Sequence, residues 1–393
     1  MKVLHFFKTF WPDSLGGIER VIDTIASGLV DSGVKSTVLT LSSEPQPGEL
    51  FRNGYRVVQA RKNFEFASTG ISFDAIGKFR DLARESDIIH YHFPWPFMDL
   101  AHWTTRHGKP SIVTYHADAL GKGMFGRTVL TPLYGAVARR FLASVDKVVA
   151  TSPQYASSSP LLRGLGREVD FIPLGISDTS PPAPLPAHVD AMRARVGQDF
   201  FLFVGVLRPY KGLETLIEAA RHTGHKVIIA GDGKERDRLE AIIRHQGVSN
   251  VVMLGHVSEE DKSALLALCK AFAFPSNNRA EAFGISLVEA SRFGKPMISC
   301  DLTTGTSYVN IDGVTGLVVP ASDSKAFGEA MTALASDAEL VRGMGKAARA
   351  RYERHFRASI VAMRYLEAYE SLLAARSISG QASVASFSPK ASR

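Results

Sequence analysis

Several features that define other classes of protein are absent from this 393-residue sequence. It holds only two cysteines, Cys269 and Cys300, which cannot form a disulfide framework or a Cys-x-x-Cys zinc site. No apolar run reaches the roughly 18–20 residues of a membrane-spanning helix. Lys8 interrupts the apolar start, which we interpret as a first strand and not as a signal peptide. We therefore expect a protein of a reducing compartment, the cytoplasm.

Two further absences restrict the function. The formal charge is +7, but both halves share it, and no basic arm with interleaved aromatic residues indicates a nucleic-acid partner. The surplus charge either keeps the protein soluble or favours anionic ligands and anionic membrane surfaces. The histidines form neither H-E-x-x-H nor H-x-x-E-H, which argues against a zinc hydrolase.

What the sequence does contain is a regular alternation of strand and helix patterns. Hydrophobic residues make up 45% and charged residues 22%, as in a globular protein. Unbroken apolar runs, typical of parallel strands covered on both faces, occur at 2–7, 36–41, 55–60, 88–92, 111–116, 147–152, 169–175, 200–206, 226–231, 251–256, 271–276, 296–300 and 316–320. Helix-period stretches separate most of them, which predicts an α/β protein with doubly wound sheets.

The division into domains is predicted from prolines at positions 181, 182, 184 and 186, which indicate a stiff, extended linker. We expect two Rossmann-like domains, over residues 1–177 and 200–357, joined by a linker over 178–199. A helix over 358–376 is expected to pack back on the first domain. The Ser- and Ala-rich tail, 377–393, is expected to be disordered.

Ligands of open α/β sheets bind beyond the carboxyl ends of the strands, so the loops there hold the candidate sites. Gly16 and Gly17 stand between the first strand and a helix, where backbone amides can hold a phosphate. This loop lacks G-x-G-x-x-G, and an ordinary strand-to-helix turn is the alternative. Arg208 and Lys211 follow the first strand of the second domain. Two cations there suit a diphosphate, with solvated surface charges as the alternative.

A third loop follows the strand at 271–276. Glu281 lies in this loop and can accept hydrogen bonds from sugar hydroxyls. The amides of Gly284 and Ile285 open the next helix and can hold a phosphate. Glu289, about one turn into that helix, can grip a vicinal diol such as that of ribose. A simple surface charge is the alternative, although the helix around it is apolar.

These motifs, in this order and spacing, resemble a known family. V-G-x-L-R-x-x-K-G, A-G-D-G, L-G-x-V, and E-A-F-G-I-S-L-V-E-A with G-K-P resemble the C-terminal half of the retaining GT-B glycosyltransferases of glycosyltransferase family 4. The first half resembles the family more loosely, through the two glycines and T-Y-H-A-D. The run GTSYVNIDGVTGLVVP is similar to bacterial mannosyl- and rhamnosyltransferases of polysaccharide assembly. The resemblance implies two Rossmann-like domains that face a central cleft.

The resemblance also implies roles for single residues. The residues around the donor diphosphate would be Gly16, Gly17, Arg208, Lys211, Gly284 and Ile285. Glu281 would contact the donor sugar and Glu289 the ribose. His116, which is otherwise an ordinary loop histidine, would reach the reaction centre. The backbone at Val257 and the carboxylate of Glu259 would lie around the nucleobase.

The resemblance leads to an expected donor. A carboxylate at Glu259 can accept the N1 and N2 hydrogens of guanine, a donor pair that uracil lacks, so we expect a GDP-sugar. Two departures from the family pattern concern the identity of the sugar: Ala282 replaces a usual glycine, and Thr303–Tyr308 replaces a glycine-rich loop. No D-x-D motif is present to hold a divalent metal. We expect no cofactor and no metal, because the cations and helix amides would stabilise the leaving diphosphate.

The acceptor side offers fewer signals. Trp95 and Phe97 could stack on a sugar ring. The segment 124–142 is apolar and carries Arg127, Arg139 and Arg140. It could lie on a membrane that holds a lipid-linked acceptor, as first-domain helices of the family do, or form a core helix with charges at its rim.

Together these features predict a cytoplasmic enzyme, peripheral on the inner face of the cytoplasmic membrane. It would move mannose or a related deoxyhexose from a GDP-sugar to a glycan or lipid-linked glycan, with retention of configuration. No side chain is an obvious covalent nucleophile, which favours a front-face mechanism. The alternatives are a UDP-sugar-dependent transferase, a nucleotide-sugar epimerase of the same architecture, and a non-catalytic sugar-binding protein.

Overall fold

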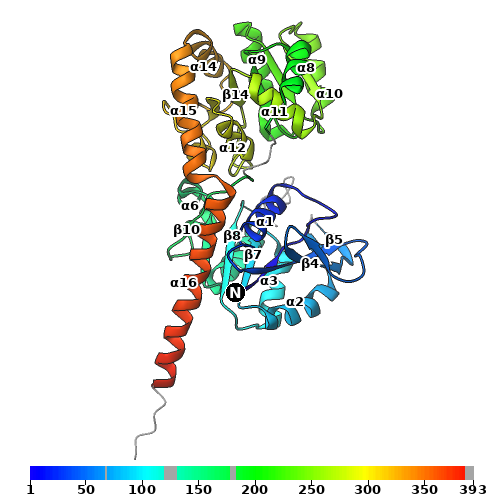
Figure 1. Cartoon of the computed structure of the whole chain (residues 1–393), viewed down its shortest axis with the longest axis vertical. Helices are drawn as coiled ribbons and strands as arrows, with labels where there is room; N and C mark the ends of the chain where they lie inside the picture. The colour runs from blue at the N-terminus through cyan, green and yellow to red at the C-terminus, as the bar shows by residue number, and fades with distance from the viewer. Residues whose placement is uncertain (67–68, 119–130, 178–182, 386–393) are drawn as a thin grey trace, which may run out of the picture. The chain divides into compact units, whose positions relative to one another are not determined.

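The computed structural model describes residues 1–66, 69–118, 131–177 and 183–385. The chain forms two compact units (Figure 1). Unit 1 comprises Met1–Thr151, Ser159–Ile172 and the chain from Val361 onward, and unit 2 comprises Ser152–Ser158 and Pro173–Ile360.

Unit 1 is built on an eight-stranded sheet in the order β10-β9-β8-β7-β1-β2-β4-β3, in which only β3 and β4 pair antiparallel. Its strands are β1 (Lys2–Phe6), β2 (Lys35–Ser42), β3 (Leu50–Arg52), β4 (Tyr55–Arg61), β7 (Ile88–Phe93), β8 (Ser111–Tyr115), β9 (Lys147–Ala150) and β10 (Asp170–Phe171). A separate hairpin pairs β5 (Phe64–Phe66) with β6 (Thr69–Ile71). Its helices are α1 (Gly17–Gly28), α2 (Phe73–Glu85), α3 (Pro96–Thr105), α5 (Thr131–Ser144) and α7 (Pro160–Arg163).

Unit 2 is built on a six-stranded parallel sheet in the order β13-β12-β11-β14-β15-β16. Its strands are β11 (Phe201–Val204), β12 (Val227–Ala230), β13 (Val251–Gly255), β14 (Ala271–Phe274), β15 (Met297–Cys300) and β16 (Gly316–Val319). Its helices are α6 (Pro153–Ser158), α8 (Pro186–Val196), the 3-10 turn η2 (Pro209–Lys211), α9 (Leu213–Thr223), α10 (Arg236–His245), α11 (Glu259–Leu268), α12 (Ile285–Arg292), α13 (Thr306–Val309), α14 (Ser324–Ser336) and α15 (Ala338–His355).

The sequence patterns explain these elements. β7 and β8 are buried at every residue, as expected of strands covered on both faces. In α9, Leu213, Leu216 and Ile217 face the core of unit 2 at helical spacing. The prediction of an α/β protein with two doubly wound sheets is confirmed, and each predicted apolar run contains a strand.

Two predictions about the connecting segments are wrong. The expected extended linker contains helix α8, because Pro186 fits the first helical turn and Met192 and Val196 are buried as the helix packs on α11. The expected disorder from residue 377 onward is contradicted as far as Ala385, since α16 (Ala358–Ala385) continues through residues with no proline to stop it. Residues 386–393 lie outside the described part of the chain.

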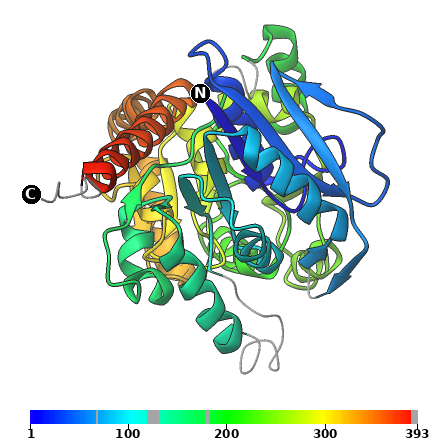
Figure 2. The ribbon, with the colours of Figure 1, turned by 90° about the horizontal axis from the view of Figure 1, so that it is seen from below.

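Polar contacts attach α16 to the sheet of unit 1, along which it runs (Figures 1 and 2). The buried hydroxyl of Tyr369 shares a hydrogen bond of 2.7 Å with Nδ1 of His90. The buried hydroxyl of Tyr365 shares one of 2.8 Å with Thr114, which in turn bonds to His90 at 2.8 Å. These bonds fix the helix in one register, because any shift would leave buried polar groups without partners.

Tyr369→Phe should therefore lower the free energy of unfolding by about 1–2 kcal/mol, because His90 loses a buried hydrogen-bond partner. Ser371→Ala, on the exposed side of the same helix, should change stability by about 0.5 kcal/mol or less. Urea unfolding measures both. Equal effects of the two substitutions would contradict a role of the tyrosine hydroxyl in holding the helix.

Candidate active site

The order of strands in unit 2 determines where its site lies. After β11 the chain fills one side of the sheet with β12 and β13, and it then returns to the other side with β14, β15 and β16. The topological switch point is thus between β11 and β14, where open α/β sheets bind their ligands. Arg208 and Lys211 follow β11, and Glu281 follows β14. The topology brings the predicted residues to one edge of the sheet.

Lys211 and Glu281 form a mostly buried ion pair at this edge. Nζ of Lys211 lies 2.5 Å from Oε2 of Glu281, and each side chain is only 11% exposed. Ser276 donates a second hydrogen bond of 3.1 Å to the same carboxylate oxygen. The ammonium group also lies 4.9 Å from the centre of the Phe274 ring. With little water present, each charge needs the other, and Lys211 is held ready as a cation.

A close approach of two loops makes this pair possible. Gly212 has a φ of +63°, and a Cβ there would lie 2.1 Å from the carbonyl oxygen of Pro275. Only glycine fits both the backbone conformation and the space. The amide of Asn277 donates to the carbonyl of Tyr210 at 2.9 Å, which joins the same two loops. The glycine of the R-x-x-K-G motif thus lets the β11 loop contact the β14 loop.

The start of α12 offers backbone amides beside Glu281. Gly284 has a φ of +86° and precedes Ile285, the first residue of the helix, and as a glycine it has no side chain with which to cap this end. Uncapped N–H groups and the positive end of the helix dipole favour an anion. Thr304 donates to the carbonyl of Glu281 at 2.9 Å, and the amide of Gly305 to that of Ala282 at 2.8 Å. The segment that departs from the family pattern therefore supports the Glu281 loop.

Lys262 is a candidate site residue that the sequence analysis missed. It is buried in α11, with Nζ 2.8 Å from Oε1 of Glu289 and 2.7 Å from Oε2 of Glu259. One ammonium group therefore links the predicted ribose and nucleobase carboxylates. The spacing of Glu259 and Lys262, three residues apart in a helix, was the available signal. Val257 lies half-buried just before this helix.

Two other predicted diphosphate positions have a different setting. Arg208 is exposed and directly precedes η2. Gly16 caps α1 with its backbone, and a Cβ there would lie 2.9 Å from the carboxylate of buried Glu19. That carboxylate accepts hydrogen bonds from Thr9 at 2.7 Å and Ser14 at 3.1 Å. Gly16 thus has a steric reason to be glycine in addition to any contact with a ligand, and Gly17 begins the helix.

His116 of unit 1 ends a line of buried imidazoles. Its Nε2 lies 3.1 Å from Nδ1 of His92, whose Nε2 lies 3.2 Å from Nδ1 of His5. Between neutral rings, one must donate and the other accept in each bond, so the whole line has one direction. Within the described residues, the outer nitrogens, Nδ1 of His116 and Nε2 of His5, have no hydrogen-bond partner. The direction of the line decides whether His116 presents a donor or an acceptor.

Burial keeps this histidine cluster neutral. Loss of hydration lowers the pKa of His5 and of His116 to about 3, and it lowers the pKa of His90 and of His92 well below the usual range. Nitrogens of His5, His90 and His92 lie close enough together to hold a metal ion. Both nitrogens of His90 and of His92 are already hydrogen-bonded, so we assign no metal to them.

The predicted stacking of an acceptor sugar on Trp95 and Phe97 is wrong. Trp95 is fully buried, packs on Phe6 and donates to the carbonyl of Gly70 at 3.0 Å, while Phe97 is 4% exposed. Neither ring has a face for a sugar. Both follow a strand that ends in the core, where the hydrophobic effect buries aromatic rings.

The predicted membrane segment is described only in part. Arg127 lies outside the described residues. In α5, Ala138, Phe141 and Leu142 are buried, whereas Arg139 and Arg140 are exposed. This part of the segment is a core helix with charges on its outer side. No helix in the described ranges has both the length and the apolar character needed to cross a membrane.

Comparisons with known proteins agree with this fold. The profile "Glycosyltransferase Family 4" matches residues 15–179, and "Glycosyl transferases group 1" matches residues 188–351. The D-rhamnosyltransferase WbpZ of Pseudomonas aeruginosa is 46% identical over 358 residues, which are 91% of this chain and 93% of the relative. The O-antigen chain mannosyltransferase C of Escherichia coli is 40% identical over 379 residues, 96% and 100% of the two chains.

A solved structure, the sucrose-phosphate synthase of Thermosynechococcus elongatus, matches with a TM-score of 0.76 at 22% identity, over 95% of this chain and 99% of that one. The fold is therefore GT-B. The chain belongs to the glycosyltransferases of family 4 and is a hexosyltransferase. The resemblance seen in the sequence is confirmed, and the epimerase and the sugar-binding protein are set aside.

The histidine cluster predicts a loss of stability in acid. Because the folded-state pKa values lie below the unfolded value of about 6.5, the unfolded chain binds more protons below that pH. The stabilisation is complete above pH 6.5 and is lost as the pH falls toward the folded values. At pH 5.5 each of the four histidines should cost about 1.4 kcal/mol.

Urea unfolding at pH 7.5 and pH 5.5 measures this loss. His5→Gln should reduce the loss, because one titrating group is gone, whereas exposed His245→Gln should leave it unchanged. Identical pH dependence in both variants would show that the cluster is not the cause.

Lys262→Met should weaken binding of the predicted nucleotide, GDP, about tenfold, because Glu259 and Glu289 lose the cation that holds them. Lys262→Arg should recover most of the affinity, and Lys346→Met, an exposed position in α15, should have no effect. Calorimetric titration of variants shown to be folded by their melting curves is the measurement. Unchanged affinity in Lys262→Met would remove these carboxylates from the nucleotide site.

Proposed function

We propose that the chain transfers mannose or a related deoxyhexose from a GDP-sugar to a glycan or lipid-linked glycan, with retention of configuration. The observation that carries this proposal is the Lys211–Glu281 pair at the switch point of unit 2, beside the uncapped start of α12. Relatives at 46% and 40% identity are a D-rhamnosyltransferase and an O-antigen chain mannosyltransferase, which supports the class of sugar and its use in polysaccharide assembly.

We infer that Lys211 changes its partner from Glu281 to the diphosphate when the donor binds. Without donor, Lys211 neutralises Glu281. With donor, its ammonium group and Arg208 would stabilise the charge that develops on the leaving diphosphate, with the amides of Gly284 and Ile285. Glu281 would then accept hydrogen bonds from the hydroxyls of the transferred sugar.

The remaining contacts follow the family resemblance. Glu289, fixed by Lys262, would hold the ribose, and Glu259, fixed by the same lysine, would accept from guanine. Gly16 and Gly17 would approach the diphosphate with their backbone, and Val257 would lie beside the base. His116 stays neutral because of its low pKa and would hydrogen-bond to the sugar without gaining a charge.

The chemical step would need no metal and no covalent intermediate. Glu281 is engaged by Lys211 and Ser276, which suits a carboxylate that orients a sugar better than a nucleophile. A front-face reaction, in which the leaving phosphate takes the proton of the acceptor hydroxyl, explains retention. We place the enzyme in the cytoplasm, peripheral on the inner face of the membrane, where a lipid-linked acceptor would be found.

A thermal-shift and transfer assay tests the proposal. GDP at 100 times its dissociation constant should add about 2.7 kcal/mol to the stability of the folded state, whereas UDP, ADP and dTDP should add less.

Lys211→Met should slow transfer from GDP-mannose by about 10–150-fold, the scale of a charged hydrogen bond. EDTA should leave the rate unchanged.

Controls separate catalysis from folding. Lys211→Met leaves Glu281 buried without its cation and should lower stability by about 3–5 kcal/mol. Lys211→Met combined with Glu281→Gln should recover stability but not the rate, and exposed Lys346→Met should keep both. Stabilisation by UDP and not by GDP would refute the donor, and a wild-type rate in the double variant would refute the role of the pair.

A further inference from the structure

A hollow of about 1050 Å³ lies on unit 1 at the edge opposite to His116. Its wall includes Ser111, the first residue of β8, and Asp146, which directly precedes β9. His116 follows the other end of β8, five residues and about 16 Å farther along the strand. The hollow therefore belongs to the amino ends of these strands, whereas His116 lies at their carboxyl ends.

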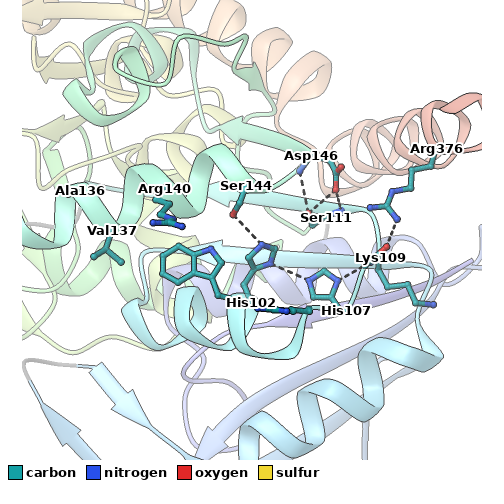
Figure 3. A pocket seen from close by; sticks show the side chains of 13 residues that line it. His102, His107, Lys109, Ser111, Ala136, Val137, Arg140, Ser144, Asp146 and Arg376 are labelled. Carbon is teal, nitrogen blue, oxygen red and sulfur yellow. Dashed lines mark hydrogen bonds between the residues drawn. The ribbon is translucent and has the colours of Figure 1, made fainter. Parts of the chain in front are cut away.

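Positive charge dominates this hollow. Four cations line it, from α3's C-terminal end, the following loop, α5 and α16: Arg106, Lys109, Arg140 and Arg376. The one carboxylate among the lining residues is that of Asp146, whose Oδ2 accepts hydrogen bonds from the amide of Ser111 at 2.7 Å and its hydroxyl at 2.9 Å. Figure 3 shows Arg140 and Arg376 on either side of the histidine pair, whereas Lys109 extends outward and donates to the carbonyl of Arg84 at 3.1 Å.

Two histidines, His102 and His107, also line the hollow. Nε2 of His107 lies 3.2 Å from Nδ1 of His102, whose Nε2 lies 3.2 Å from the hydroxyl of Ser144 (Figure 3). Burial is the main cause that lowers the pKa of His107 to about 4. His102, Arg376 and Lys109 act in the same direction, and the carboxylate of Asp146 acts in the opposite one. His107 is thus neutral at pH 7 and contributes no charge of its own to the hollow.

Apolar groups stand beside the cations. Val137 is 38% exposed on α5, and the half-buried ring of Trp103 also lines the hollow. Guanidinium groups pair well with phosphate oxygens, and an indole ring packs on the organic part of a phosphate ester. The combination fits an anion with an organic group attached better than a bare surface ion.

We propose that this hollow, lined by Arg106, Lys109, Arg140 and Arg376, binds the phosphate group of a phosphate ester. The ester has two sources with the same chemistry: a soluble phosphate or the headgroup of an anionic phospholipid. This site is independent of the donor site of unit 2 and of the function proposed for it.

The test uses the full chain with its donor site saturated by GDP. Inorganic phosphate and glycerol 3-phosphate are titrated while NMR follows the ring of His107, and binding to vesicles of phosphatidylglycerol or phosphatidylcholine is measured by sedimentation. An anion in the hollow should raise the pKa of His107. Arg106→Gln combined with Arg140→Gln should weaken binding at least about tenfold, because two charged hydrogen bonds are lost.

The matched control is Arg80→Gln combined with Arg139→Gln, which removes the same charge from exposed positions of unit 1 outside the hollow. It should bind within about twofold of the parent chain. Binding of the soluble phosphates alone supports a soluble ligand, and binding of phosphatidylglycerol but not phosphatidylcholine vesicles supports a lipid headgroup. Absence of both, or equal losses in the two double variants, would overturn the proposal.

Discussion

A charge removed from water must be given a partner, and this constraint organises unit 2. Lys211 and Lys262 each lie buried at the carboxyl edge of the sheet, and each is neutralised by a carboxylate from a different segment, Glu281 or Glu289. The pairs hold the β11 loop to the β14 loop and α11 to α12. The two pairs also hold their ammonium and carboxylate groups in fixed positions. A ligand that carries phosphates and hydroxyls can use these groups with little rearrangement, which is the advantage of preorganised polar groups.

The same constraint is met in unit 1 without charges. Its central strands carry His5, His90 and His92 into the core, where the rings stay neutral. His5 bonds to His92, His90 bonds to Thr114 and to Tyr369 of α16, and Thr114 also bonds to Tyr365. Directional bonds of this kind specify one docking register for a helix that apolar packing alone would leave free to slide. The C-terminal helix is thus part of the unit that the N-terminus of the chain begins.

Much of this architecture was predictable from local patterns. The apolar runs mark the strands, and the R-x-x-K-G and E-A-F-G-I-S-L-V-E-A motifs mark Lys211, Glu281 and Glu289, because spacing along one loop or helix is encoded locally.

Lys262 was not found, since a lysine after three acidic residues looks like a solvated charge until tertiary packing buries it. The histidine line spans three strands, and no local pattern shows that they are neighbours. Trp95 and Phe97 were misassigned because residue type does not show which side of a loop faces the core.

In the proposed reaction, Lys211 exchanges Glu281 for the donor diphosphate. A crystal structure of the chain with GDP tests it most directly. We expect the ammonium group of Lys211 within hydrogen-bond distance of the β-phosphate, with the carboxylate of Glu281 turned toward the space where the sugar would lie. A structure in which GDP is bound while Lys211 and Glu281 remain paired, with no cation of the β11 loop on the diphosphate, would contradict it.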